Sequence, residues 1–129
     1  MTVCNGLHGM DLSTFEHHIR EAFLAIPHDL REKIHNVAFV VEELERPVHG
    51  PGHDIRLHRV LLGLYEGVPL LRRSAGYSNV LPDKITIFKG PIEALGHGDV
   101  ETIRRIIHEV VHHEVGHYFG MEEAEVRAW

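Results

Sequence analysis

Residues 108 to 123, HEVVHHEVGHYFGMEE, contain the pattern His-Glu-x-x-His twice in immediate succession. The first copy starts at His108 and the second at His113. On a helix, the two histidines of such a pattern lie four residues apart on one face. There they can hold one zinc ion, and the glutamate can act as a general base in peptide hydrolysis. The chain has 13 histidines among 129 residues, so a five-residue match alone is a weak signal.

Both copies fall on one long predicted helix. We expect this helix to begin after the N-cap residue Asp99 and to end at Gly120, which can adopt a left-handed conformation. With about 100° of rotation per residue, the apolar residues of the helix fall within one arc, which predicts its buried face. These residues are Ile103, Ile106, Ile107, Val110, Val111 and Tyr118.

The helical projection separates the two copies. Glu114 projects near the middle of the buried arc, and His113 and His117 lie along one edge of it. His108 and His112 project to the opposite side, where we expect water. A buried carboxylate is costly unless a cation or hydrogen-bond donors compensate it, and a metal ion bound by the neighbouring histidines would do so. The pattern therefore assigns the metal to the second copy.

An acidic side chain beyond the helix is the expected third metal ligand. Gly116 lies inside the helix, which indicates a close approach by another element. Gly120 can turn the chain back and bring Glu123 towards the two histidines, which completes the pattern HExxHxxGxxE. The spacing leaves Glu122, Glu125, a water molecule or a group from another chain as alternatives.

Other elements must position this helix. A Ser-x-x-Glu capping box at residues 13–16 and apolar residues at helical spacing predict an N-terminal helix over residues 14–25, stopped by Pro27. Asp29 should cap a short second helix that runs to residue 35.

Three segments rich in β-branched and aromatic residues predict extended chain. They are residues 37–41, residues 59–73 with a turn near 66–67, and residues 84–90. Pro69 places the second half of the middle segment at an edge of the sheet or outside it. Residues 44–54 and 74–83 are expected to be loops because they are rich in Pro, Gly, Ser or Asn.

Bulk composition limits the function. With 129 residues, of which 43% are hydrophobic and 25% charged, we expect one ordinary soluble domain over residues 1–129. The net charge of −6 argues against nucleic acid as a partner, since phosphate binding needs clustered Lys and Arg. Neither a membrane span nor a signal peptide is evident, so we expect no membrane partner and a cytoplasmic location. Cys4 stands alone, which excludes an internal disulfide.

Four segments, taken in order, resemble the minimal zincin-like metallopeptidases of bacteria. They are VAFVVEE, LLGLYEGVPLLRR, LPDKITIFKGPIEAL and HHEVGHYFGMEE. The resemblance implies an α+β fold, in which a small mixed sheet packs on a long C-terminal metal-binding helix, with the N-terminal helices added. By motif position it implies that His113 and His117 bind Zn2+ and that Glu114 is the general base. The acidic position after the helix-ending glycine matches Glu123 as the third ligand.

Zinc held by two neutral imidazoles and one carboxylate keeps a fourth position open for water. It lowers the pKa of that water towards about 7 and polarises a carbonyl. Glu114 is placed to take the proton of the water and return it to a leaving amine, so a peptide or protein is the expected substrate. The alternative is that Glu114 only orients a structural metal.

Three functions follow from these features. The first is a zinc-dependent peptidase. The second is a catalytically weak or inactive metal-stabilised binding or regulatory module. It is favoured because a chain without the C-terminal subdomain of larger zincins offers one cleft wall, so a second copy or a partner would complete the cleft. The third is a His-rich metal buffer, which is disfavoured because nine of the 13 histidines lie outside residues 108–117.

Overall fold

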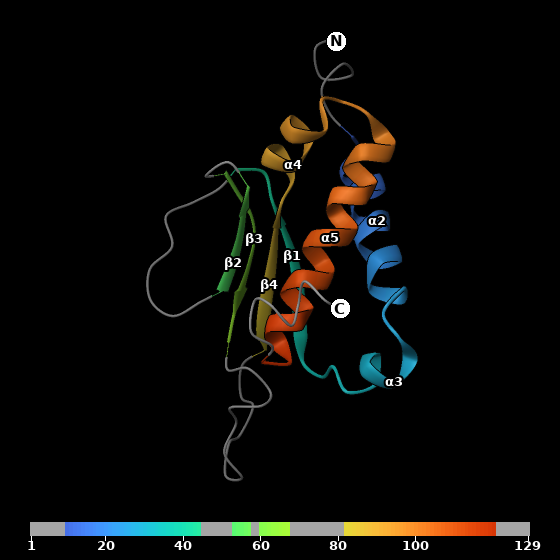
Figure 1. Ribbon diagram of the computed structural model, residues 1–129, viewed down its shortest axis with the longest axis vertical. Helices are drawn as coiled ribbons and strands as arrows, with labels where there is room; N and C mark the ends of the chain where they lie inside the picture. The colour runs from blue at the N-terminus through green and yellow to red at the C-terminus, as the bar shows by residue number, and fades with distance from the viewer. Residues whose placement is uncertain (1–9, 45–52, 58–59, 68–81, 121–129) are drawn as a thin grey trace.

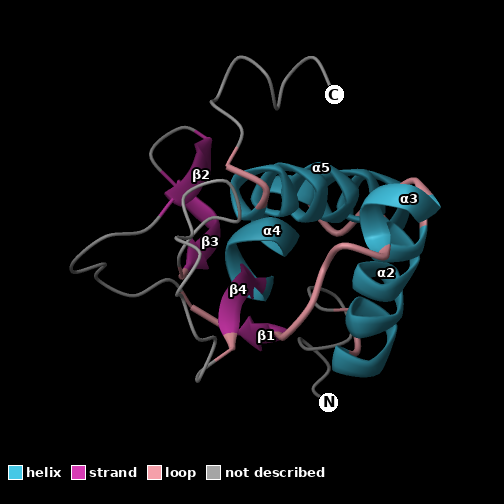
Figure 2. Cartoon of the chain, turned by 90° about the horizontal axis from the view of Figure 1, so that it is seen from below, coloured by secondary structure: helices cyan, strands magenta, loops and turns pink. Residues whose placement is uncertain are grey.

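Helices cover one face of a four-stranded sheet (Figure 1). The computed structural model describes residues 10–44, 53–57, 60–67 and 82–120. Its elements, in chain order, are α2 (Leu12–Leu24), α3 (His28–Arg31), β1 (Val37–Glu42), β2 (His53–Leu57), β3 (Val60–Glu66), β4 (Asp83–Phe88), α4 (Lys89–Gly96) and α5 (Val100–Tyr118). Figure 2 shows α2, α4 and α5 on the same side of the sheet. The predicted α+β fold class is thus confirmed.

The sheet is mixed, as expected, and its strand order is β1-β4-β3-β2. β1 runs parallel to β4, with Val37 opposite Asp83, whereas β4 and β3, and β3 and β2, are antiparallel. β1 and β2 therefore form the two edges. The β2–β3 ladder carries an irregularity between Ile55 and Arg56.

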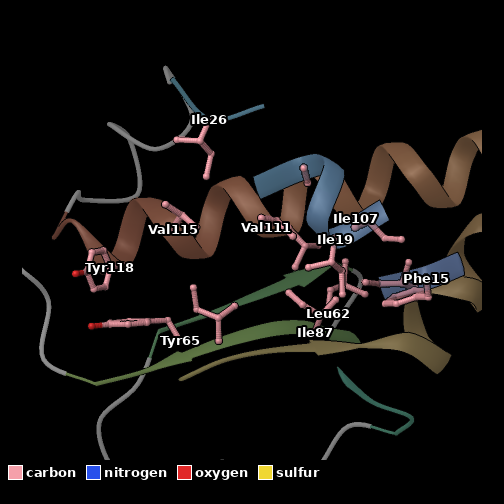
Figure 3. Packing of buried hydrophobic residues seen from close by; sticks show 14 of the residues in the cluster. Phe15, Ile19, Ile26, Leu62, Tyr65, Ile87, Ile107, Val111, Val115 and Tyr118 are labelled. Carbon is pink, nitrogen blue, oxygen red and sulfur yellow. The ribbon is translucent and has the colours of Figure 1, made fainter. Parts of the chain in front are cut away.

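One apolar core joins the sheet to the helices (Figure 3). Ile85 and Ile87 of β4 contribute from the sheet, and Phe15 of α2 contributes from the N-terminal helix. The predicted buried face of α5 is confirmed, although Ile106 is only partly buried. The fully or almost fully buried members of that face are Ile103, Ile107, Val110, Val111 and Tyr118.

Both predicted ends of α5 are confirmed. Asp99 is the N-cap residue, and its Oδ2 accepts hydrogen bonds from the backbone N and the Oγ1 of Thr102 at 2.9 and 2.6 Å. After the helix, Gly120 has a φ of 87°, and its N–H donates to the backbone oxygen of His117 at 2.9 Å. A residue with a Cβ would be strained at this φ, so glycine fits the position.

The N-terminal helices start earlier than expected. α2 begins at Leu12 with Asp11 as its N-cap residue, and no side chain makes a capping hydrogen bond there. The predicted Ser13-to-Glu16 capping box is wrong because Ser13 already lies inside the helix. The stop near Pro27 is confirmed, but Pro27 is also the N-cap residue of α3, so the predicted cap at Asp29 is wrong. Asp29 lies in the first turn of α3, where a carboxylate suits the helix dipole.

Two elements were not predicted from the sequence. β2 begins at His53, inside the predicted loop over residues 44–54. α4 follows β4 directly, and its Pro91 lies in the first turn, where the missing N–H has no intrahelical partner to lose. The predicted strand at residues 37–41 extends by one residue, to Glu42.

Candidate metal centre

The two histidines of the second copy lie side by side on the last two turns of α5. The ring centroids of His113 and His117 are 4.8 Å apart, with an interplanar angle of 72°. Only 6% of His117 is exposed, and His113 is half-buried. Two imidazoles at this separation, on residues i and i+4, can turn toward one shared ion.

Glu114 points into the protein. Its exposed fraction is 0%, which places it among the largest fully buried side chains. The sequence prediction that Glu114 occupies the buried face is therefore correct. Burial disfavours an ionised carboxylate unless positive charge or donors lie near it, and a cation at the adjacent histidines would favour the ionised form. Neutral imidazoles are common zinc ligands, so His113 and His117 fit this metal.

The position of the predicted third ligand is not described by the structure. Glu123 lies outside the described residues, as do its alternatives Glu122 and Glu125. Over residues 10–44, 53–57, 60–67 and 82–120, no group of three or more His, Cys, Asp or Glu side chains could hold a metal. Within the described residues only His113 and His117 of the predicted ligand set can be placed, and all three ligands stay a prediction.

The histidines of the first copy are less exposed than the helical projection predicts. His108 and His112 are both half-buried because α2 packs along this side of α5. Nε2 of His112 lies 2.9 Å from the backbone oxygen of Ala22, and Nε2 of His108 lies 3.4 Å from Oε1 of Glu21. A projection of a single helix cannot reveal that a second helix covers its polar side.

An ion-pair network joins α2 to α5 beside the first copy. Nε of Arg104 donates to Oε1 of Glu21 at 2.9 Å, and His18 and His108 lie 3.3 and 3.4 Å from the same oxygen. The hydrogen bond from Arg104, followed by those with His18 and His108, lowers the pKa of the Glu21 carboxyl from 4.5 to about 2. Sequence reasoning missed this network because Arg104 and His108 are 83 and 87 positions away from Glu21.

Tyr118, the last residue of α5, links this helix to the segment that precedes β1. Its Oη lies 3.4 Å from the backbone oxygen of Lys33 and 3.5 Å from that of His35. Its ring meets the Tyr65 ring edge-on at 6.2 Å, and the Tyr65 hydroxyl donates to Oδ2 of Asp83 at 2.7 Å. The sequence placed Tyr118 in the apolar arc but carried no signal for its hydroxyl contacts.

One known protein family matches most of the chain. The sequence model of the zincin-like metallopeptidase family matches residues 34–129, and the chain belongs to this family. The family typically binds zinc. No curated protein matches the chain. The family match begins after α2 and α3, so the helix that covers the first copy lies outside it.

No helix among the described residues combines the length and the apolar character that crossing a bilayer requires.

Proposed function

We propose that this protein is a zinc-dependent peptidase that acts on a peptide or protein substrate. His113 and His117 would hold the ion, with Glu123 as the third ligand and Glu114 as the general base. The observation that carries the proposal is the fully buried Glu114 on the same helix turn as two adjacent imidazoles, in a chain of the zincin-like metallopeptidase family.

Zinc bound at these histidines would polarise the substrate carbonyl and make a water molecule more acidic. The remaining chemistry belongs to residues of the chain. Glu114 accepts the proton of the attacking water and passes it to the nitrogen of the leaving amine. The packing of α5 on β3 and β4 fixes the helix that carries all three side chains, so that the base and the ligands keep their mutual positions.

A second candidate function is a metal-stabilised binding module. The complete burial of Glu114 favours it, because a general base must meet water whereas a structural carboxylate need not. In that case the same residues hold a metal that stabilises the fold, and no peptide is cleaved.

The substitution Glu114→Gln separates the two functions. It preserves the shape of the side chain and removes the base, so a peptidase should retain zinc while cleavage falls by about 10²- to 10⁴-fold. Zinc content and turnover of any peptide cut by the wild-type protein would be measured on the same samples. Glu109→Gln is the matched control, because Glu109 holds the equivalent position in the first copy and is exposed. If zinc-loaded wild type cuts no peptide of a diverse library, the binding module replaces the peptidase.

A further inference from the structure

Among the described strands, β1 pairs with β4 alone, so its other edge has no described partner. In the parallel register, Asp83 donates to the backbone oxygen of Asn36, so alternate residues of β1 bond to β4. The N–H and C=O groups of the intervening residues Val37, Phe39 and Val41 consequently point to the open edge.

The two edges of the sheet differ in chemistry. Natural sheets usually protect an edge with charged residues, Pro or a bulge, because an unprotected edge pairs with other chains. β2 has such features: Asp54 and Arg56 in a five-residue strand, and an irregular register at Ile55. β1, with the sequence VAFVVE, has no Lys or Pro, and its single charge is at Glu42, the last residue. Of the two described edge strands, β1 is therefore the one whose sequence lacks these protective features.

A groove of about 520 Å³ runs beside this edge, between β1 and α2. Its floor consists of Val37, Phe39 and Val41, and its wall includes Ile19 and Phe23 of α2. The rings of Phe23 and Phe39 meet edge-on at 5.5 Å. The residues whose backbone faces the open edge therefore also direct their side chains into the groove. An added strand could form backbone hydrogen bonds and bury alternate apolar side chains at the same time.

The rim of the groove carries one charge of each sign. Glu16 and Arg20 are both exposed, line the groove and lie one turn apart on α2. If a twofold axis passed between these two positions, Glu16 of one copy would face Arg20 of the other, and symmetry would form the reverse contact. The charges on the groove rim of one copy would then be complementary to those of a second copy.

We propose that β1 pairs antiparallel with β1 of a second copy of this chain, about a twofold axis. The two four-stranded sheets join into one, the apolar floors of the two grooves become continuous, and the two α2 helices face each other. The second copy supplies what the edge requires: an extended segment without Lys or Pro whose alternate residues are apolar. His113 and His117 do not line this groove, so the dimer forms independently of the metal centre.

Sedimentation velocity of wild type and two Val41 variants tests the strand pairing. Val41→Pro removes an N–H that points to the open edge and leaves the β4 ladder intact, so it should fold and be monomeric. Val41→Ala, the matched control, keeps that N–H and should remain dimeric. Circular dichroism checks that each variant is folded. A wild-type monomer up to about 100 μM, where even a weak specific dimer is populated, would overturn the proposal. A dimeric Val41→Pro variant would also overturn it.

Charge-reversal variants test whether the partner of the β1 edge is a second copy of this chain. Glu16→Arg and Arg20→Glu, each alone, place like charges across the twofold axis and should raise the dissociation constant of the dimer by about tenfold. The double variant restores opposite charges between copies and should recover wild-type association. Recovery requires that both partners carry the swap, so it is specific to a second copy of the chain. Single variants that associate like wild type, or a double variant as weak as the singles, would contradict the proposed interface.

Discussion

At the scale of single residues, the neighbours of each histidine distinguish the two copies of the pattern. His113 and His117 lie together beside a buried carboxylate, whereas His108 and His112 contact α2. Under the proposed function, His113→Ala and His117→Ala should each abolish stoichiometric zinc, and His108→Ala should not. The measurement is metal content after purification in zinc, by atomic emission.

His112→Ala adds a distinction that the sequence alone does not predict. This variant should keep its zinc but lower the melting temperature, because Nε2 of His112 lies 2.9 Å from the backbone oxygen of Ala22. Equal zinc losses from the His108 and His113 variants would show that the metal does not belong to the second copy alone.

The third ligand is also a question for single side chains. If Glu123 completes the coordination, Glu123→Ala should weaken zinc binding by at least about tenfold, whereas Glu122→Ala should have little effect. Competition with a chromophoric chelator measures both affinities. The reverse result would move the ligand to Glu122. Unchanged affinity in both variants would point to Glu125, water or another chain.

At the scale of elements, the contact between α2 and α5 depends on pH. The pKa of Glu21 is about 2 in the folded protein, below its ordinary value of 4.5, chiefly because Arg104 donates to it. Since the folded pKa is the lower one, the stability from Glu21 is present above pH 4.5 and is lost as the pH falls towards 2. The melting temperature of Glu21→Gln should therefore approach that of wild type over this acidic range.

Glu101→Gln is the control for this pH dependence. Glu101 bonds to Arg104 at 3.3 Å from a side chain that is 77% exposed, so its removal should change the melting curve less than removal of Glu21. A constant difference between wild type and Glu21→Gln from pH 5 to pH 2, a range of about three units, would contradict the assigned role.

Elements were predictable where the signal lies within one segment. The cap at Asp99, the left-handed Gly120 and the apolar arc of α5 are local features, and all are confirmed. One local turn signal was misleading, because the Pro- and Gly-rich stretch that predicted a loop includes the start of β2. The apolar arc of α5 correctly predicted the burial of Glu114. It could not predict that α2 covers His108, because this contact joins segments that are distant in sequence.

At the scale of the whole molecule, the part of the chain outside the family match shares its core with the part inside it. Phe15 and Ile19 of α2 belong to the same apolar cluster as Ile107 of α5 and Ile87 of β4. The family match covers residues 34–129 and omits α2. We therefore expect residues 34–129 to depend on α2 for cooperative folding, and the prediction of a single domain can be tested through one core side chain.

Phe15→Ala should destabilise the entire molecule. Phe15 is 0% exposed, and truncation of such an aromatic side chain costs about 3–5 kcal/mol through lost burial and the cavity that remains. Urea unfolding would be followed by far-ultraviolet circular dichroism and by the near-ultraviolet aromatic signal, to which Tyr118 at the end of α5 and Tyr65 of β3 contribute. Leu12→Ala is the control, because Leu12 lies on the same helix and is 52% exposed, so its loss should change stability by only about 0.5 kcal/mol. One shared transition that shifts to lower urea in Phe15→Ala is expected of a single cooperative domain, whereas an unchanged near-ultraviolet transition would mean that α2 unfolds separately from the zincin-like part.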